Sequence, residues 1–219
     1  GYRILRAMYK LLSATPSPYA RKVRIALAEK GIPFELVTEN PWNAGATTPG
    51  YNPLGKLPVL ILEDGGTVYE SAYILEWLEV HHPSPALYPA EPMARLAARR
   101  LEVLCDGVCD AIVLWLMESL RPEAQRSQPW QARQARKIEG GLAEMARLVP
   151  ANSEFSVGEA FGLGDIAVGT MLGYLDGRYP VLNWRPLYPE LSERFERLHQ
   201  RASFRATMPV PQIMEAGVV

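Results

Sequence analysis

The sequence predicts an α/β domain over residues 1–87, followed by an all-α helix-bundle domain over residues 93–219. Two observations support this division. Short apolar runs alternate with helical patterns up to the proline-rich stretch "HHPSPALYPAEP", whereas the pattern beyond it is helical almost throughout. The length of 219 residues accommodates two small domains, and a hydrophobic content of 48% provides enough apolar surface for their cores.

The first elements predict a βαβ unit. Residues 9–12 form a short apolar run typical of a buried strand, and residues 34–37 form a second one. The helix between them has clear boundaries: Ser17 is a favoured N-cap, Pro18 fits the first helical position, and Gly31 is typical of a helix exit. Such a unit implies two parallel strands joined by a right-handed crossover.

A loop-rich stretch separates this unit from a predicted hairpin and a second helix. Residues 59–62 and 67–69 flank "EDGG", which is a strong hairpin signal. A helix follows from about Ser71, and its apolar residues share one face: Ile74, Leu75 and Leu78. The order β-α-β, loop, β-β-α is that of the thioredoxin-like fold, so we expect the N-terminal domain to be thioredoxin-like.

The rest of the chain predicts a helix bundle. A long helix starts near Met93, and the almost wholly apolar residues 166–175 indicate a helix at the centre of the bundle. Apolar stripes mark the other helix faces: Leu104, Val108, Ala111, Ile112, Trp115 and Leu116 on the long helix, Ile138, Leu142 and Met145 on the next, and Leu191, Phe195 and Leu198 on another.

The composition excludes several classes of protein. A formal net charge of −1 gives no general attraction to nucleic acid or to an anionic membrane, and no apolar run approaches the roughly 18–20 residues of a membrane span. Cys105 and Cys109 lie four residues apart on one helix face, where the backbone opposes a disulfide and no second ligand pair suggests a metal site. We expect two buried thiols in a cytoplasmic chain. Met8 is a sensible natural start, so whether residues 1–7 belong to the native protein is left open.

The first predicted helix begins with a sequence that looks like a redox site without its sulfurs. Ser17-Pro18-Tyr19-Ala20 resembles the C-P-Y-C site of a glutaredoxin with both cysteines replaced. Unpaired N–H groups and the helix dipole favour an anion at a helix start, so Ser17 can bind a thiolate that arrives with a substrate. The alternative is that Ser17 is only an N-cap.

The magnitudes make thiolate binding reasonable. A free thiol has a pKa of about 8.5, and lowering it by roughly two units requires about 2.7 kcal/mol. A helix start contributes roughly 0.3–1 kcal/mol, reaching about 2 in partly buried geometry. A hydrogen bond from a hydroxyl to a charged acceptor adds roughly 1.5–3 kcal/mol. The two effects together suffice, whereas the dipole alone does not.

Two further segments carry candidate binding groups. In "NPLGKLPVL", residues 52–60, Leu57-Pro58 stands where thioredoxin-like folds place a cis proline, after a residue whose backbone is open to an extended peptide. An ordinary trans proline at a strand edge also fits. At Glu70-Ser71, the Ser71 hydroxyl and N–H groups can cap the following helix. They can equally bind a ligand carboxylate, with Glu70 taking the adjacent amine.

These segments in this order, followed by a helical domain, resemble the cytosolic glutathione transferase family, in its bacterial, serine-type form. The resemblance covers nearly the whole chain from Met8. Three stretches look like the family's glutathione-site segments, and a fourth is similar to its buried capping-box helix: "SPYARKVRIALAEKGIPFE", "NPLGKLPVL", "ESAYILEWLE" and "GLGDIAVGTMLGYL".

The resemblance implies a role for each matching residue. Ser17 matches the serine that activates the glutathione thiol, and Leu57 matches the residue whose backbone pairs with the cysteinyl part. Glu70 and Ser71 match the pair that holds the γ-glutamyl end. Lys56 matches a lysine that reaches toward the glycyl carboxylate in related classes.

The chain also departs from the family's pattern. Gly162 stands where a Ser or Thr usually begins the capping box, so one of the two reciprocal hydrogen bonds with Asp165 is missing. Because Ser17 replaces a cysteine, strong glutaredoxin-like activity is less expected. The Ser-Ser-Cys run of the isomerase-type class is absent, which weakens maleylacetoacetate isomerisation as a candidate. Tyr9 and Thr15 are nearby hydroxyls that compete with Ser17, although Tyr9 lies early in its strand.

The predicted function is glutathione transfer. The bound thiolate attacks an electrophilic carbon of a small hydrophobic substrate, with glutathione as cosubstrate and without a metal. The substrate pocket is expected between Ser17 and the long helix, where the candidates are Cys105, Val108, Ile112 and Trp115; core packing explains most of these positions. The resemblance further implies a homodimer. A glutathione-dependent disulfide reductase and a non-enzymatic binding module on the same fold are the alternatives.

Overall fold

The computed structural model describes residues 8–215, so the question about residues 1–7 lies outside it. The described residues divide into two units, residues 8–86 together with 206–215, and Leu87–Arg205. The sequence prediction assigned all residues from 93 onward to the helical domain. The final segment departs from it because residues 206–215 form no helix or strand and hydrogen-bond to the N-terminal unit.

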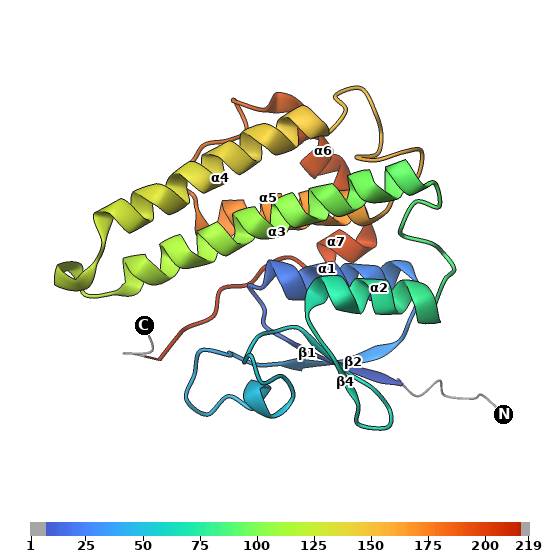
Figure 1. Ribbon diagram of the computed structural model, residues 1–219, viewed down its shortest axis with the longest axis horizontal. Helices are drawn as coiled ribbons and strands as arrows, with labels where there is room; N and C mark the ends of the chain where they lie inside the picture. Colours follow the sequence, from blue (N-terminus) through green and yellow to red (C-terminus); the bar gives the residue numbers. More distant parts are fainter. Residues whose placement is uncertain (1–7, 216–219) are drawn as a thin grey trace. The chain divides into compact units, whose positions relative to one another are not determined.

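The N-terminal unit is a four-stranded mixed sheet with two helices on one face (Figure 1). The strand order is β2-β1-β3-β4, in which β1 is parallel to β2 and antiparallel to β3, and β3 is antiparallel to β4. This is the predicted thioredoxin-like arrangement. Its elements are β1 (Tyr9–Ser13), α1 (Pro18–Glu29), β2 (Phe34–Thr38), the 3-10 turn η1 (Thr48–Gly50), β3 (Val59–Ile61), β4 (Thr67–Val68) and α2 (Ser71–His81).

Helix α1 has the boundaries that its sequence indicates. Ser17 is the N-cap and Pro18 the first residue, and Gly31 follows the helix with a φ of 65°. A glycine suits this left-handed position because it has no Cβ to clash. Apolar residues of α1 and β1 then meet in the core, where Leu11 and Val23 are fully buried.

The second unit is a helix bundle. Its long helices α3 and α4 run alongside each other, and α5 packs against α3 (Figure 1). Every residue from Leu163 to Leu175 of α5 is buried, as expected for the central helix, so the predicted fold class is confirmed. No helix within residues 8–215 combines the length and apolar character needed to span a membrane. The elements are α3 (Pro92–Leu120), η2 (Glu123–Gln125), α4 (Gln128–Leu148), α5 (Leu163–Arg178), α6 (Pro189–Leu198) and α7 (Ala202–Arg205).

The glycine that begins α5 has a packing reason. A Cβ at position 162 would lie 2.4 Å from the carbonyl oxygen of Leu87, and that oxygen accepts a hydrogen bond of 2.8 Å from Leu163 N–H. Asp165 still makes its half of the capping box, since its Oδ2 accepts from Gly162 N–H at 3.2 Å. A Ser or Thr at this position would therefore collide with the backbone that leads into the helical unit.

Candidate functional site

The sheet register brings the predicted binding segments to one end of the N-terminal unit. Leu12, near the end of β1, pairs with Val59, the first residue of β3, and β4 runs antiparallel to β3. The segments that follow β1, precede β3 and follow β4 therefore meet at the same end of the sheet. They carry Ser17, Leu57 and the Glu70-Ser71 pair respectively.

Ser17 caps α1 and still has a proton to donate. Its Oγ accepts a hydrogen bond of 3.1 Å from Ala20 N–H, and the residue is partly exposed. A serine hydroxyl has one O–H donor in addition to its lone pairs, so accepting the capping bond leaves this donor available to an anion. The two roles considered for Ser17, N-cap and thiolate binder, are therefore compatible.

Positive charge lies one turn into α1. The backbone N–H of Arg21 donates to the Ser17 carbonyl at 3.0 Å, and the Arg21 side chain is buried. Burial and the neighbouring Arg24 lower the pKa of Arg21 to about 10, so its guanidinium is still protonated at neutral pH. The guanidinium itself contacts the C-terminal segment, where its Nε donates to Thr207 Oγ1 at 3.1 Å.

The two competing hydroxyls differ in position. Tyr9 begins β1, at the opposite end of the strand from Ser17, and its hydroxyl lies 2.6 Å from Nε2 of His82. Thr15 lies in the loop before α1 and is partly exposed, and its carbonyl accepts from Val210 N–H at 3.1 Å. Only Thr15 is close enough in the chain to share a ligand with Ser17.

The Leu57-Pro58 peptide bond is cis, in agreement with the thioredoxin-like placement and not with the trans alternative. Leu57 is partly exposed, while Pro58 is buried. The hydrogen bonds of residues 8–215 include none to the N–H or C=O of Leu57, so an extended ligand can pair with this backbone. Lys56 precedes it with an exposed side chain.

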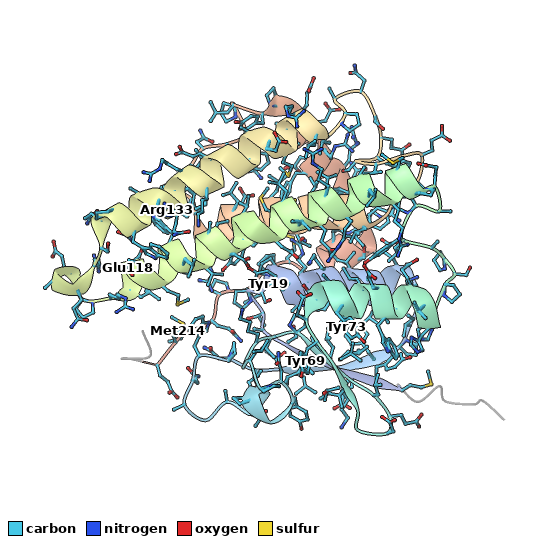
Figure 2. All side chains as sticks on the ribbon, viewed as in Figure 1. Tyr19, Tyr69, Tyr73, Glu118, Arg133 and Met214 are labelled. Carbon is cyan, nitrogen blue, oxygen red and sulfur yellow. The ribbon has the colours of Figure 1, made fainter. Side chains whose placement is uncertain are left out.

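At the start of α2, the N-cap is Glu70 and not Ser71. Oε1 of Glu70 accepts from Tyr73 N–H at 3.3 Å, so the capping role considered for the Ser71 hydroxyl is wrong. Ser71 is the first helical residue, only 1% exposed, and its Oγ has no hydrogen-bond partner among the described residues. In the chain, Tyr69 precedes this pair and Tyr73 follows it, and both tyrosines are labelled in Figure 2.

An unpartnered hydroxyl is unusual in a buried position, because such a group costs free energy unless something hydrogen-bonds to it. The first N–H groups of a helix also lack partners inside the helix, and the dipole makes this end favourable for an anion. The start of α2 can therefore receive a carboxylate at Ser71. Glu70 is an exposed residue and uses Oε1 for the cap, so its second carboxylate oxygen is available to an amine beside it.

The four predicted pocket residues occupy different environments within α3. Three of them are at most 2% exposed: Cys105, Val108 and Ile112. Cys105 Sγ lies 3.8 Å from Met145 Sδ of α4, and Val108 fills the space beside Gly141 of the same helix. Trp115 is only partly buried and meets the Tyr179 ring edge-on, with the centroids 4.8 Å apart. Of the four, Trp115 has the most surface to offer a substrate.

The cysteines and other potential metal ligands form no metal site in the part of the chain that the structure describes. Cys105 and Cys109 are both free and buried. No group of three or more His, Cys, Asp and Glu side chains in this part is arranged to hold a metal ion.

Sequence reasoning missed a set of polar residues that supports the Lys56-Leu57 segment. Asn52 is 1% exposed and its Nδ2 donates to the Lys56 carbonyl at 3.0 Å, while Thr48, fully buried, accepts from Asn52 N–H at 2.9 Å. The Asn-Pro pair at 52–53 is a turn signal, and it was the one local feature that could have indicated a structural role for Asn52. Nothing in the local pattern singled out Thr48, because its side-chain partner Glu39 lies nine residues away.

Comparisons with known proteins match both halves of the chain. Residues 16–81 match the family described as "Glutathione S-transferase, N-terminal domain", and residues 128–197 match "Glutathione S-transferase, C-terminal domain". Among solved structures, a glutathione S-transferase of Methylobacterium radiotolerans in complex with glutathione sulfonate is 60% identical, with a TM-score of 0.94 over 96% of this chain and 99% of that one. Another, from Methylobacillus flagellatus and with GSH bound, is 43% identical, with a TM-score of 0.88 over 92% of this chain and 100% of that one.

Two curated relatives are also similar over most of their length. The uncharacterised GST-like protein YibF of Escherichia coli is 36% identical over 91% of this chain and 98% of its own. A maleylacetoacetate isomerase of Pseudomonas aeruginosa is 30% identical over 93% of this chain and 97% of its own.

Proposed function

Because the chain belongs to the glutathione S-transferase family, we propose that it conjugates the thiolate of glutathione to small hydrophobic electrophiles. The observation that carries the proposal is the Ser71 hydroxyl, which is buried without a hydrogen-bond partner among the described residues at the start of α2. A ligand carboxylate would satisfy it. The solved relatives in complex with glutathione sulfonate and with GSH support glutathione as that ligand.

Glutathione would be held at three points. Ser71 binds the γ-glutamyl carboxylate and Glu70 the adjacent amine, and Lys56 attracts the glycyl carboxylate. The N–H and C=O of Leu57 pair with the cysteinyl part in the manner of an added strand. This arrangement directs the thiol toward the start of α1, since all these segments lie at one end of the sheet.

Ser17 would then stabilise the thiolate. Its O–H donates to the sulfur while its Oγ accepts the capping bond from Ala20 N–H. The thiol proton leaves to solvent before the reaction. The sulfur next donates its electron pair to an electrophilic carbon, forming the S–C bond, and a leaving group such as chloride departs with the electron pair of the bond that breaks. Ser17 acts by lowering the thiol's pKa, so that more thiolate is present at neutral pH.

The second substrate requires an apolar surface. The candidates in α3 are Cys105, Val108, Ile112 and Trp115, of which Trp115 is best supported because it is only partly buried. A Trp115→Ala change is expected to alter the relative rates with electrophiles of different size, while leaving glutathione affinity unchanged.

We also propose a cytoplasmic homodimer. Large apolar side chains are exposed on α2 and α3, among them Val80, Leu96 and Val103 at 76%, 61% and 61% exposure, and such side chains are common at subunit interfaces. The free cysteines are compatible with a reducing compartment. Sedimentation analysis of the purified chain tests the dimer, and a single species at the monomer mass would contradict it.

Maleylacetoacetate isomerisation is a second candidate because a 30% identical relative carries that name. This reaction also uses a glutathione thiolate, so the binding roles above would be retained. The chain lacks the Ser-Ser-Cys run of that class, since Ser17 is followed by Pro18 and Tyr19. Transfer to electrophiles is therefore preferred.

The proposal is tested by retention on immobilised glutathione followed by three parallel assays. These use chlorodinitrobenzene for transfer, hydroxyethyl disulfide for reduction, and maleylacetone for isomerisation. Retention with turnover of chlorodinitrobenzene is the expected result. Turnover confined to one of the other substrates would replace the proposed reaction, and retention without any turnover would indicate a binding module. Absence of retention would contradict glutathione binding itself.

A further inference from the structure

The C-terminal segment, residues 206–215, forms hydrogen bonds to the rest of the N-terminal unit through side chains as well as backbone. Nε of Arg21 on α1 donates to Thr207 Oγ1 at 3.1 Å. Farther along, the segment meets the loop that follows β2: Asn40 Nδ2 donates to the Ile213 carbonyl at 2.8 Å, and Ala44 N–H donates to Oε2 of Glu215 at 3.1 Å. Met214, labelled in Figure 2, lies between these last two contacts in the chain.

A further contact of this segment, made by Gln212, begins a chain of hydrogen bonds that are linked through the residues they share. Nε2 of Gln212 donates to the Glu39 carbonyl at 3.0 Å. The Glu39 carboxylate accepts from Thr47 N–H and from the Thr48 hydroxyl. The Thr48 carbonyl accepts from Asn52 N–H at 2.9 Å, and Nδ2 of Asn52 donates to the Lys56 carbonyl at 3.0 Å. The chain of bonds thus runs from the C-terminal segment to the residue before Leu57.

We propose that the C-terminal segment positions the glutathione-binding residues Lys56 and Leu57 through Glu39, Thr48 and Asn52. The inference rests on the function proposed above. Gln212, Glu39, Thr48 and Asn52 are positioning residues, because none of them needs to touch glutathione. They fix the turn whose backbone the cysteinyl part would meet, so that binding does not have to order it.

The burial of the chain's middle members supports this role. Thr48 is fully buried and Asn52 is 1% exposed. The polar contacts described for these two residues either belong to this series of hydrogen bonds or close the local turns over residues 48–55. Burial raises the pKa of Glu39, but the hydrogen bonds from Thr48 and Thr47 outweigh it and leave that pKa lowered. The carboxylate form that accepts both bonds is therefore the stable one at neutral pH.

The test uses Gln212→Glu, which keeps the shape of the side chain but removes the donor. We expect the KM for glutathione to rise about two- to tenfold, corresponding to one lost hydrogen bond, while kcat at saturating glutathione and the KM for the electrophile stay unchanged. The matched control is Ile213→Ala. Ile213 is 93% exposed and contributes only its backbone carbonyl, so this change should leave all three constants as they are.

A second variant tests whether the effect of Gln212→Glu on the KM for glutathione depends on the Glu39 carboxylate. Glu39→Ala removes the carboxylate but keeps the carbonyl that Gln212 contacts. In this background the Gln212→Glu change should no longer alter the KM for glutathione, because the connection to Thr48 is already cut. Additive effects of the two changes, or an unchanged KM in Gln212→Glu alone, would overturn the inference.

Failure of the proposed function would look different. If the wild-type chain does not bind glutathione, the positioning can still be measured by hydrogen exchange of residues 52–57. Faster exchange there in Gln212→Glu, but not in Ile213→Ala, is the expected result. Equal exchange in wild type and Gln212→Glu would overturn the inference independently of any activity.

Discussion

At the scale of single residues, one hydroxyl can serve structure and chemistry together. The Ser17 oxygen accepts from Ala20 N–H, which satisfies the helix, and its hydrogen can be donated to an anion. A serine at a helix start therefore does not have to be either a cap or a catalytic residue. The two contributions are separable because one concerns unfolding and the other concerns the titration of a bound thiol.

Ser17→Ala should separate them. Losing the cap should cost about 1 kcal/mol of unfolding free energy. Losing the bond to the thiolate should raise the bound thiol's pKa by about one to two units, for a hydrogen bond of roughly 1.5–3 kcal/mol. Turnover at neutral pH should then fall about ten- to hundredfold and partly recover in alkaline buffer, where the thiolate forms without help. Glutathione affinity should stay within about threefold, since the thiol is a small part of the ligand.

The measurement is an ultraviolet difference titration of the bound thiolate in wild type and Ser17→Ala, with Thr15→Val as the control. Thr15 is the neighbouring hydroxyl, and its described contact uses the backbone carbonyl, which valine retains. If the Ser17→Ala curve superimposes on the wild-type curve while Thr15→Val shifts it, Thr15 and not Ser17 stabilises the thiolate.

Ser71 differs from Ser17, because its buried hydroxyl makes no hydrogen bond to the described residues and therefore does not stabilise the helix. Ser71→Ala should weaken glutathione binding by roughly 1.5–3 kcal/mol, the range for hydrogen bonds to a charged group. It should not lower the melting temperature, because Glu70 is the cap and the Ser71 Oγ has no partner among the described residues. Calorimetric titration and a parallel thermal melt measure the two quantities. A lower melting temperature with an unchanged dissociation constant would mean that Ser71 is structural.

At the scale of elements, α5 shows how packing can override a capping preference. A Ser at position 162 would supply the missing side-chain acceptor, which is worth about 1 kcal/mol in an unobstructed cap. Its Cβ would meet the Leu87 carbonyl oxygen at 2.4 Å, however, and overpacking of this kind typically costs about 1–3 kcal/mol. The collision is with backbone, which cannot rotate away, so the net effect should be unfavourable.

We therefore expect Gly162→Ser to lower the free energy of unfolding even though it restores the family's usual residue. Chemical denaturation measures the change. The matched control is Gly177→Ser in the same helix, where a Cβ would meet nothing within 4 Å, and a serine there should be neutral or slightly stabilising. Equal stability of wild type and Gly162→Ser would show that the Leu87 backbone can move aside.

At the scale of the whole molecule, the sequence predicted those features that are determined by residues close together in the chain. The strand at residues 9–12, the cap at Ser17 and the apolar central helix all follow from periodicity and capping rules, and the order of elements then predicted the fold. The set of candidate residues at the sheet end followed in the same way. The sequence did not predict which of Glu70 and Ser71 caps α2. Both residue types are compatible with a helix start, and only the backbone geometry decides between them.

The sequence did not predict the long-range contacts, because they join residues that are far apart in the chain. Residues 206–215 carry no periodic pattern that ties them to the first unit, and the bond from Gln212 to the Glu39 carbonyl joins residues 173 positions apart. A side chain that bonds to a backbone carbonyl leaves little trace in one sequence, since almost any residue supplies the carbonyl. The support of Lys56 by Asn52, Thr48 and Glu39 therefore had to be found in the structure.

Ligand linkage provides a prediction for the whole chain. A ligand that binds only the folded form stabilises it, by about 2.7 kcal/mol at a concentration 100 times its dissociation constant. The proposed contacts all lie in the N-terminal unit. Glutathione should therefore raise the temperature of the calorimetric transition in which this unit unfolds. S-methylglutathione should raise it similarly, because it keeps the γ-glutamyl and glycyl ends. Cysteinylglycine lacks the group that Glu70 and Ser71 would hold, and should raise it far less. The Ser17→Ala variant should respond to all three as wild type does. A shift of equal size with cysteinylglycine would remove the start of α2 from the binding site, and glutathione contacts would then have to be sought at Lys56 and Leu57 alone.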